Sequence, residues 1–474
     1  MKTPSPVTNR REPVVSRDIL LPFILLTTLF AWWGLANNMT DTLLPAFKRI
    51  MSLEDSKTAW IQVVCYALGY GCFAIPGAIF MMRYTYKSGV LLGLGFFITG
   101  TLLFFPARCA IAIPDLCYAF YLCAILITFG GLAILETACN AYICAMGNPA
   151  TAVRRLNLAQ SFNPFGSLVG IAVSQVFILS QLSPLSAAQR AGLSPEELSA
   201  VQKPELAAIS YTYAAIGIIL LITWLMIFLC RMPNLREQRR PLRLAETARR
   251  LLHNKRYLCG VVALFFCVGS HIGCWSFTVR YCMATLHLDQ LAQSDPALLR
   301  NVEPISAFFY RVCEWIHFHG FIPQTAEQAG ATFYVLSQIL FISGRFICTG
   351  LMRFIRPRTL LIILSATAAL CMVVVVFVPN VVGVYALILS NGCMSLMFPT
   401  IFSFSTQSLG EDTKLAGAGL VSMLCGGAIL TQIQGIISDR TGHIELAYIV
   451  PFTAFVVIFL YACAALRTKN TAAA

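Results

Sequence analysis

The sequence has few charged residues. Only 12% of the 474 residues are Asp, Glu, Lys or Arg, whereas a soluble domain carries about twice that share. Hydrophobic residues make up 58% of the chain, which indicates a polytopic membrane protein. The excess of 34 Lys and Arg over 21 Asp and Glu is therefore expected on cytoplasmic loops. No basic cluster is interleaved with aromatic side chains, so we expect no nucleic-acid partner.

The usual motifs of metal binding and hydrolysis are also missing. The 18 cysteines include no CxxC pair and no Cys/His set with the spacing of metal ligands. Most of them lie in apolar stretches, where small, reduced and buried thiols are expected. The chain has no HExxH and no GxSxG motif. We therefore expect no metal, no cofactor and no enzyme activity.

Twelve apolar runs have the length of membrane-spanning helices. They cover Leu20–Leu44, Ala59–Met82, Ser88–Phe105, Leu116–Ala145, Leu156–Leu182, Ala207–Leu229, Tyr257–Met283, Ala331–Leu351, Leu360–Val378, Val382–Leu409, Leu415–Ile437 and Ala447–Leu466. This pattern predicts an all-α integral membrane protein with twelve transmembrane helices. The N-terminal region has no small-residue cleavage signature, so we expect the first run to be an uncleaved anchor.

A basic segment, Arg231–Arg256, separates the sixth run from the seventh. Positive charge on short loops marks the cytoplasmic side, so we expect this segment and both termini in the cytoplasm. It divides the chain into an N-terminal six-helix bundle at 1–230, a linker at 231–256 and a C-terminal six-helix bundle at 257–474. A bacterial inner membrane is the expected location, and we expect a monomer.

The two halves repeat each other weakly. Met82-Arg83-Tyr84 follows the second run, and Met352-Arg353-Phe354 follows the eighth. Gly131–Glu136 in the fourth run lies opposite Gly392–Met397 in the tenth. Two related six-helix bundles are typical of a carrier with its site between the halves. The long loop Leu286–Gly330 has an aromatic stretch that predicts a short amphipathic helix on the outer surface.

A single carboxylate, Glu136, lies inside the fourth run. A charged group at that depth is costly, so it is expected to face a polar cavity rather than lipid. A structural partner on a neighbouring helix is the alternative. Because desolvation favours the neutral acid, such a group is suited to binding and releasing a proton.

Two further sets of residues are candidates for the wall of the same cavity. Trp33, Asn37 and Asp41 are spaced by four and share one helical face, although an aromatic belt at the membrane surface would give the same pattern. Gln160 and Asn163 are also neighbours on a face, where polar side chains can instead join helices. Amides and carboxylates commonly bind the hydroxyl groups of sugars, and aromatic rings commonly pack against the apolar face of the sugar.

Two arginines, Arg280 and Arg345, lie near the ends of their apolar runs. The ordinary behaviour of such a side chain is to extend to the membrane surface. We expect this of both.

Several segments resemble the fucose permease family of sugar/proton symporters, within the major facilitator superfamily. They are AWWGLANNMTDTLLPAF (31–47), GLAILETACNAY (131–142), RLNLAQSFNPFGSLVG (155–170), CWSFTVRY (274–281), FISGRF (341–346) and FPTIFS (398–403). The likeness extends over nearly the whole chain and is strongest in its first half. It implies two bundles of the major facilitator type that move a hexose inward with protons.

The resemblance also implies roles for individual residues. Asp41 and Glu136 match the carboxylates of the family. Asn38, Gln160 and Asn163 match positions that line its sugar cavity, and Trp33 matches a cavity aromatic. The bilayer, a sugar and protons are the implied partners, and the implied function is inward symport of a hexose or an L-fucose-like deoxyhexose by alternating access.

One departure from the family concerns specificity. The fucose-specific type carries a Gln-Tyr pair before its Pro-Thr-Ile-Phe segment, whereas this chain has Met397-Phe398. We expect both residues to border the site. A phenylalanine at position 398 resembles the pattern of relatives that take glucose or galactose. A symporter of that type is therefore the alternative. An exporter of the same superfamily is less consistent, because 163–170 lacks the GPxxGG-type signature.

Overall fold

The structure is a computed structural model. It describes residues 13–51, 61, 63–111, 113–178, 181–183, 190, 192–233, 244–294, 299–300, 302–315, 323, 326–407 and 409–470. Within the helices, the side chains of some residues, including 40–49, are outside this description. The described residues form helices and loops and contain no strand, which agrees with the all-α prediction.

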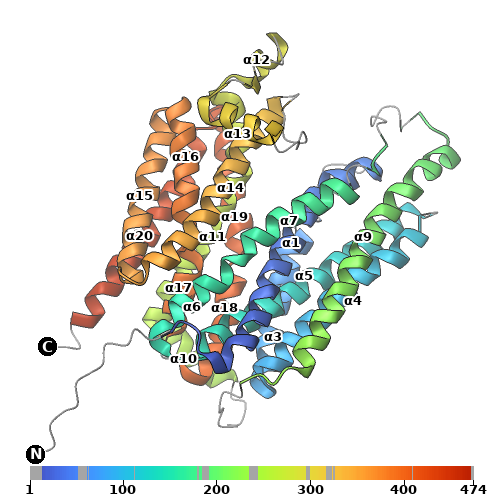
Figure 1. Ribbon diagram of the computed structural model, residues 1–474. Helices are drawn as coiled ribbons and strands as arrows, with labels where there is room; N and C mark the ends of the chain where they lie inside the picture. The colour runs from blue at the N-terminus through green and yellow to red at the C-terminus, as the bar shows by residue number, and fades with distance from the viewer. Residues whose placement is uncertain are drawn as a thin grey trace, which may run out of the picture.

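Residues before the linker form one set of helices. These are α1 (Leu20–Ile50), the π-helical η2 (Val63–Tyr70), α3 (Gly71–Arg83), α4 (Tyr86–Cys109), α5 (Pro114–Ala145), α6 (Ala152–Gln160), α7 (Phe162–Phe177) and α9 (Pro195–Leu229). Within this set α4 packs on α5 and α9, and α1 packs on α7. These helices lie together on one side of the molecule, blue to green in Figure 1.

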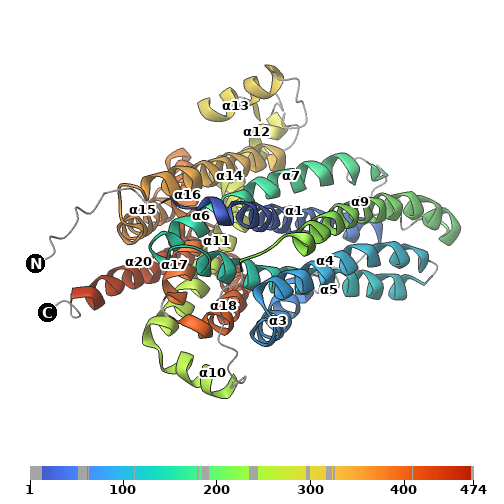
Figure 2. The same ribbon diagram turned by 60° about the horizontal axis from the view of Figure 1, so that its bottom comes forward.

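Residues after the linker form the second set. These are α11 (Lys255–Thr285), α12 (Leu288–Ser294), α13 (Pro304–Trp315), α14 (Ala326–Leu351), α15 (Pro357–Phe377), α16 (Val381–Met394), α17 (Met397–Thr406), α18 (Thr413–Ser422), α19 (Cys425–Thr441) and α20 (Ile449–Asn470). Here α11 packs on α14, α19 and α20, and α15 packs on α16 and α20. Figures 1 and 2 show this set beside the first.

Eleven helical spans of the described residues are long and apolar enough to cross a membrane. The fifth predicted run corresponds to α6 and α7, which have 9 and 16 residues and are separated at Ser161. The tenth run is likewise divided, into α16 and α17. The fold class predicted from the sequence is confirmed, and the protein is a multi-pass membrane protein.

Prolines explain both divisions. A proline has no N–H to donate to the carbonyl four residues earlier, and its ring crowds that carbonyl. Pro164 in α7 follows Gln160 by four residues, and Pro399 in α17 follows Ser395 by four. The carbonyls of Gln160 and Ser395 are therefore available to other donors.

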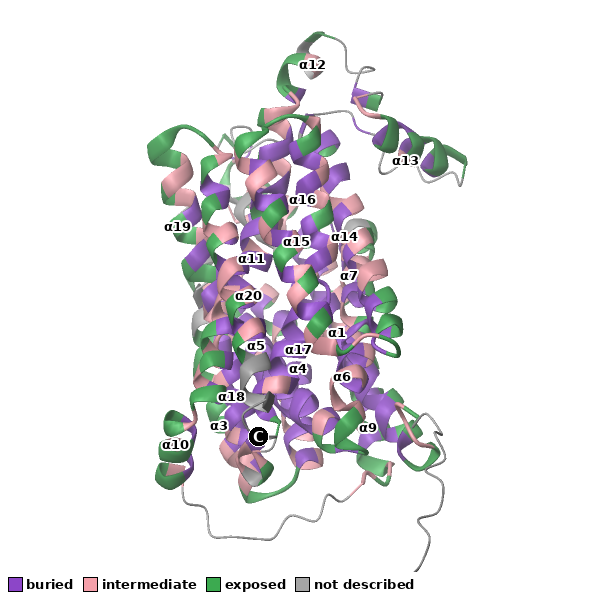
Figure 3. Cartoon of the chain, turned by 90° about the vertical axis from the view of Figure 1, so that its left-hand side faces the viewer, coloured by how far each residue is buried: buried purple, intermediate pink, exposed green. Residues whose placement is uncertain are grey.

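Short helices outside the spans mark the two ends of the bundle. Part of the basic linker forms α10 (Leu244–His253), which we did not predict, and Arg250 in it forms an ion pair of 2.7 Å with Asp412. The predicted amphipathic helix of the long loop is α13, which with α12 lies at the opposite end from α10 (Figure 1). Exposed residues lie along the outer surface of the helices, and buried ones fill the inside (Figure 3).

The two halves meet on the side of α10, where α18 packs on α3 and α5 and α17 packs on α6 (Figure 1). Hydrogen bonds between the halves at this closed end join Asn157 Nδ2 to Thr400 Oγ1 (3.2 Å), Arg345 Nη1 to Gln160 O (2.8 Å) and Lys414 Nζ to Met81 O (2.6 Å). We call these three contacts the floor, because the cavity described next lies beside them.

Candidate sugar-binding cavity

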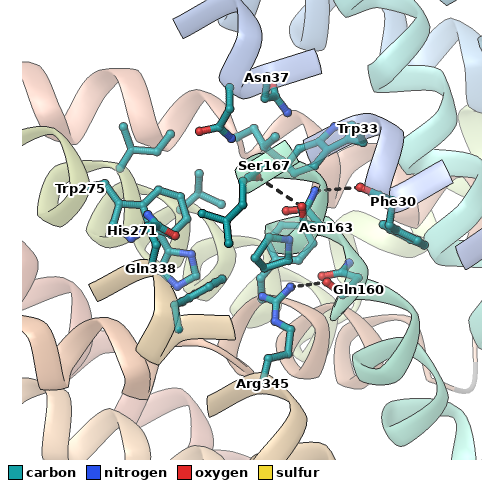
Figure 4. Close-up of a pocket in the computed structure, with 18 of the residues that line it drawn as sticks. Phe30, Trp33, Asn37, Gln160, Asn163, Ser167, His271, Trp275, Gln338 and Arg345 are labelled. Atoms are coloured by element: carbon teal, nitrogen blue, oxygen red, sulfur yellow. Dashed lines mark hydrogen bonds between the residues drawn. The ribbon is translucent and has the colours of Figure 1, made fainter. Parts of the chain in front are cut away.

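A cavity of about 430 Å³ lies between the two halves. Its volume is within the range of small-molecule sites in proteins. Helices α1, α5, α6 and α7 form one wall, and α11 and α14 form much of the other. In Figure 4 Trp33, Asn163 and Gln160 lie on one side, His271, Trp275 and Gln338 on the other, and Arg345 below.

All six residues that the sequence predicted for the sugar line this cavity. They are Trp33, Asn38, Glu136, Gln160, Asn163 and Phe398. The second predicted carboxylate, Asp41, falls in α1, but its side chain lies outside the described residues. Met397 does not line the cavity and is fully buried, so the expectation that it borders the site is wrong.

Glu136 is 6% exposed and has no salt bridge among the described residues. Its Oε2 atom has no hydrogen-bond partner in the part of the chain that the structure describes. Asn140 lies one helical turn further along α5, and its Oδ1 accepts a hydrogen bond of 2.7 Å from Gln160 Nε2. The carboxyl group therefore faces the cavity beside an ordered amide pair.

Close packing between α1 and α7 aligns their polar side chains. A Cβ atom added to Gly34 would lie 2.0 Å from the Asn163 carbonyl oxygen, and one added to Gly166 would lie 1.9 Å from the Ala31 carbonyl oxygen. Only glycine permits this backbone contact. The Asn163 amide consequently reaches across to donate to Phe30 O at 3.3 Å (Figure 4).

Aromatic groups hold the α1 side of the cavity. Trp33 Nε1 donates a hydrogen bond of 2.6 Å to the hydroxyl of Tyr70, which is fully buried. Tyr66 stacks against Tyr70 with 6.2 Å between ring centroids and also lines the cavity. The Trp33 ring is therefore fixed at the cavity wall. Asn37, beside it, has a buried Oδ1 atom with no hydrogen-bond partner among the described residues.

The second half contributes residues that our sequence analysis did not assign. His271 is 6% exposed, and its ring centroid lies 5.7 Å from that of Trp275 and 6.1 Å from that of Phe341. A signal for His271 was present, because it is the one histidine inside any of the twelve apolar runs. The intramembrane-charge argument applied to Glu136 applies equally to this imidazole.

Arg345 contradicts the expectation that it extends to the membrane surface. It is 4% exposed, and its guanidinium donates to the Gln160 carbonyl of the opposite half. The carbonyls of Gln160 and Ser395, which Pro164 and Pro399 leave without a helical donor, provide the hydrogen-bond partners that the membrane surface would otherwise supply. Arg280, in contrast, is exposed near the end of α11, as expected.

The unpartnered polar atoms indicate what the cavity can bind. Glu136 Oε2 and Asn37 Oδ1 are acceptors, and Trp275 Nε1 is a donor, and all three residues line the cavity. A ligand with several hydroxyl groups can donate to the first two and accept from the third. The described residues contain no group of three His, Cys, Asp or Glu that could hold a metal ion.

Comparison with known proteins agrees with this description. Residues 23–431 match the model of the Major Facilitator Superfamily. The chain is 35% identical to the L-fucose-proton symporter of Haemophilus influenzae, over 94% of this chain and 97% of that protein. It is 26% identical to the glucose/galactose transporter of Brucella abortus, over 97% and 98% of the two chains.

A solved transporter structure also matches this chain over most of its length. The transporter FucP, crystallised in the outward conformation, superposes with a TM-score of 0.79 at 30% identity, covering 94% of this chain and 99% of that one. The resemblance to the fucose permease family is thereby confirmed, and the relatives are named as transporters rather than as enzymes. The chain belongs to the Major Facilitator Superfamily.

Proposed function

We propose that the protein is a proton-coupled symporter that carries a hexose or an L-fucose-like deoxyhexose into the cell by alternating access. The observation that carries the proposal is Glu136, a buried carboxyl group that has no cationic partner among the described residues and faces a cavity of amides and aromatic rings. The similarity to an L-fucose-proton symporter at 35% identity over nearly the whole chain supports the same substrates.

The lining of the cavity is suited to a neutral sugar. Asn38, Gln160 and Asn163 supply amides for the hydroxyl groups. Trp33 and Phe398 supply apolar faces for the C–H surfaces of the ring. On the second half, Trp275 Nε1 is a donor with no partner among the described residues. A sugar between the halves would contact both of them, so its binding would favour their closure.

Protonation of Glu136 explains the coupling. A carboxylate that loses its water when the cavity closes is costly, whereas the neutral acid is not. Closure around the sugar would therefore require that Glu136 carry a proton. We assign the second proton-coupling position to Asp41, near the outer end of the first span, on the basis of the family resemblance.

We further propose a location and an orientation. Helix α10 of the basic linker, the beginning of α1 and the end of α20 lie on one side of the molecule (Figure 1), and positive charge assigns that side to the cytoplasm. The membrane would then be a bacterial inner membrane with both termini inside. The floor is on this side, so the cavity would be closed to the cytoplasm in this structure. We also propose that the division at 231–256 separates two functional bundles.

A glucose/galactose-type symporter is the second candidate. Phe398 favours it, because the aromatic ring lines the cavity without the hydroxyl of the fucose-specific type. The similarity to a glucose/galactose transporter at 26% identity also supports it.

Uptake by proteoliposomes tests the proposal. The purified protein is reconstituted, an inward proton gradient is imposed, and a panel of labelled sugars including L-fucose, glucose and galactose is offered. We expect accumulation of at least one of them above equilibrium, abolished by a protonophore and absent from protein-free liposomes. Accumulation of none of the hexoses would refute the proposal, and uptake without dependence on the gradient would refute the coupling.

A further inference from the structure

One buried arginine contacts the divided helices of both halves. Arg345 lies in α14, six residues before its end. Its Nη1 donates a hydrogen bond of 2.8 Å to the carbonyl of Gln160, and its Nε donates to the carbonyl of Ser395. The guanidinium carbon also lies 4.8 Å from the centre of the Phe341 ring.

These two carbonyls share a chemical property. Each belongs to the residue four positions before a proline, Pro164 or Pro399, and so lacks the N–H that would bond it within its helix. Each also lies at the carboxyl end of a helix, α6 or α16, where the helix dipole is negative. The cation is therefore compensated by two helix ends, with no salt bridge to Arg345 among the described residues.

The contact with Gln160 extends to the sugar site. Gln160 belongs to the first half, and its side-chain amide lines the cavity and donates to Asn140 Oδ1. Asn140 in turn follows Glu136 by one turn of α5. The main-chain position of a residue assigned to the sugar is thus held by an arginine of the opposite half.

We propose that Arg345 is a positioning residue that makes sugar affinity depend on the floor of the cavity; this rests on the proposed function. While the halves are in contact at the floor, Arg345 holds the end of α6, and the Gln160 amide is fixed for the sugar. Opening toward the α10 side separates α14 from α6 and breaks the contact. Gln160 is then released, affinity falls, and the sugar leaves on that side.

Two substitutions test this role. Arg345→Met removes the donors but keeps an apolar side chain in the buried space. Arg345→Lys keeps the charge, yet an ammonium lacks the planar fork that serves two carbonyls at once. Arg280→Met is the matched control, because Arg280 is exposed and belongs to the same half. Dissociation constants are measured by the fluorescence of Trp33 and Trp275, both in the cavity wall, and exchange rates by counterflow in proteoliposomes.

Because Arg345→Met loses a hydrogen bond from a charged group, we expect its dissociation constant for the sugar to be at least about tenfold larger than that of the wild type. Arg345→Lys should be intermediate, and Arg280→Met should equal the wild type. A purely structural role would reduce the amount of binding-competent protein without changing the dissociation constant. The inference is overturned if Arg345→Met, in monodisperse protein, binds sugar with wild-type affinity. If that variant does not yield monodisperse protein, wild-type affinity of Arg345→Lys overturns it.

A different result would refute the proposed function itself. If the wild-type protein neither binds nor transports a hexose, the function is wrong whatever the arginine variants do. If the wild type transports a sugar and the arginine variants bind it normally, only the role of Arg345 is wrong.

Discussion

The ammonium group of Lys414 donates a 2.6 Å hydrogen bond to the backbone carbonyl of Met81, and this contact joins the two halves of the molecule. Lys414 is 4% exposed and lies at the beginning of α18. Met81 lies in the last turn of α3, where a cation is favoured by the helix dipole. The ammonium also lies 4.8 Å from the centre of the Tyr86 ring. A buried cation therefore stabilises the closed floor.

Substitution of Lys414 should loosen this floor. In Lys414→Met the charged hydrogen bond and the ring contact are both lost, which costs about 1.5–3 kcal/mol of closed-state stability. Hydrogen–deuterium exchange of segments 78–86 and 413–422 should become faster. Lys255→Met, at an exposed lysine of α11, is the control. Unchanged exchange in Lys414→Met would show that the contact does not hold the halves together.

Specificity should respond to Phe398 rather than to Met397. Phe398 lines the cavity, so Phe398→Tyr adds a hydroxyl where a sugar can reach it. We expect the preference for L-fucose over glucose and galactose to rise about three- to tenfold, the range of one hydrogen bond. Competition against uptake of a labelled sugar gives the ranking. The same ranking in the variant and the wild type would remove Phe398 from the specificity site.

Met397→Gln should act on stability instead. Met397 is fully buried outside the cavity lining, so the new amide would have to find hydrogen-bond partners in a packed interior. A double variant, Met397→Gln with Phe398→Tyr, would carry the Gln-Tyr pair of the fucose-specific type. We therefore expect any change in its sugar preference to come from Phe398→Tyr alone.

A buried ion pair between Arg190 and Glu205 stabilises the first half away from the cavity. Arg190 Nη1 donates to Glu205 Oε2 at 2.9 Å, and Ser183 N donates to Glu205 Oε1 at 2.8 Å. Both charged residues are 1% exposed. Glu205→Ala would leave a buried guanidinium without its carboxylate, so we expect a loss of about 3–5 kcal/mol in the free energy of unfolding.

Thermal unfolding in detergent measures this loss as a lower melting temperature. Glu314→Ala is the control, because Glu314 and its partner Arg300 are both 46% exposed and such a pair contributes about 0–1 kcal/mol. Equal melting temperatures for the two variants would contradict the assignment.

The sequence predicted more of the first half of the site than of the second. Glu136, Gln160 and Asn163 stand out because polar groups inside apolar runs are costly and because helical spacing groups them. Arg345 was misassigned, because its distance from the end of the run permits a surface position. Only the fold brings it to the carbonyls that Pro164 and Pro399 leave free.

The same limit applies to the second wall and to the floor. His271 and Trp275 share a face of α11, but their spacing alone does not say that the face meets Glu136. Contacts such as that between Lys414 and Met81 join residues more than three hundred positions apart. Periodicity within a single helix carries no information about them.

Substitutions of the two predicted carboxylates, Asp41 and Glu136, should have different effects in transport assays. Asp41→Asn, fixed in a neutral form, should lose uphill uptake but retain sugar counterflow. Glu136→Ala should lose both, because it removes a sugar contact as well as a proton site. The measurements are proton-driven uptake and counterflow in the same proteoliposomes. Full uphill accumulation by Asp41→Asn would contradict its role in coupling, and normal counterflow by Glu136→Ala would remove Glu136 from the sugar site.

The most direct test of the central claim measures whether sugar and protons move together. Proteoliposomes in weakly buffered medium receive a sugar identified by the uptake panel, without any imposed gradient, and the external pH is recorded. Symport predicts a rise in external pH on addition of the sugar. Glu136→Ala proteoliposomes and wild-type samples with a protonophore should give no such rise. Sugar entry through the wild-type protein at constant external pH would contradict proton-coupled symport.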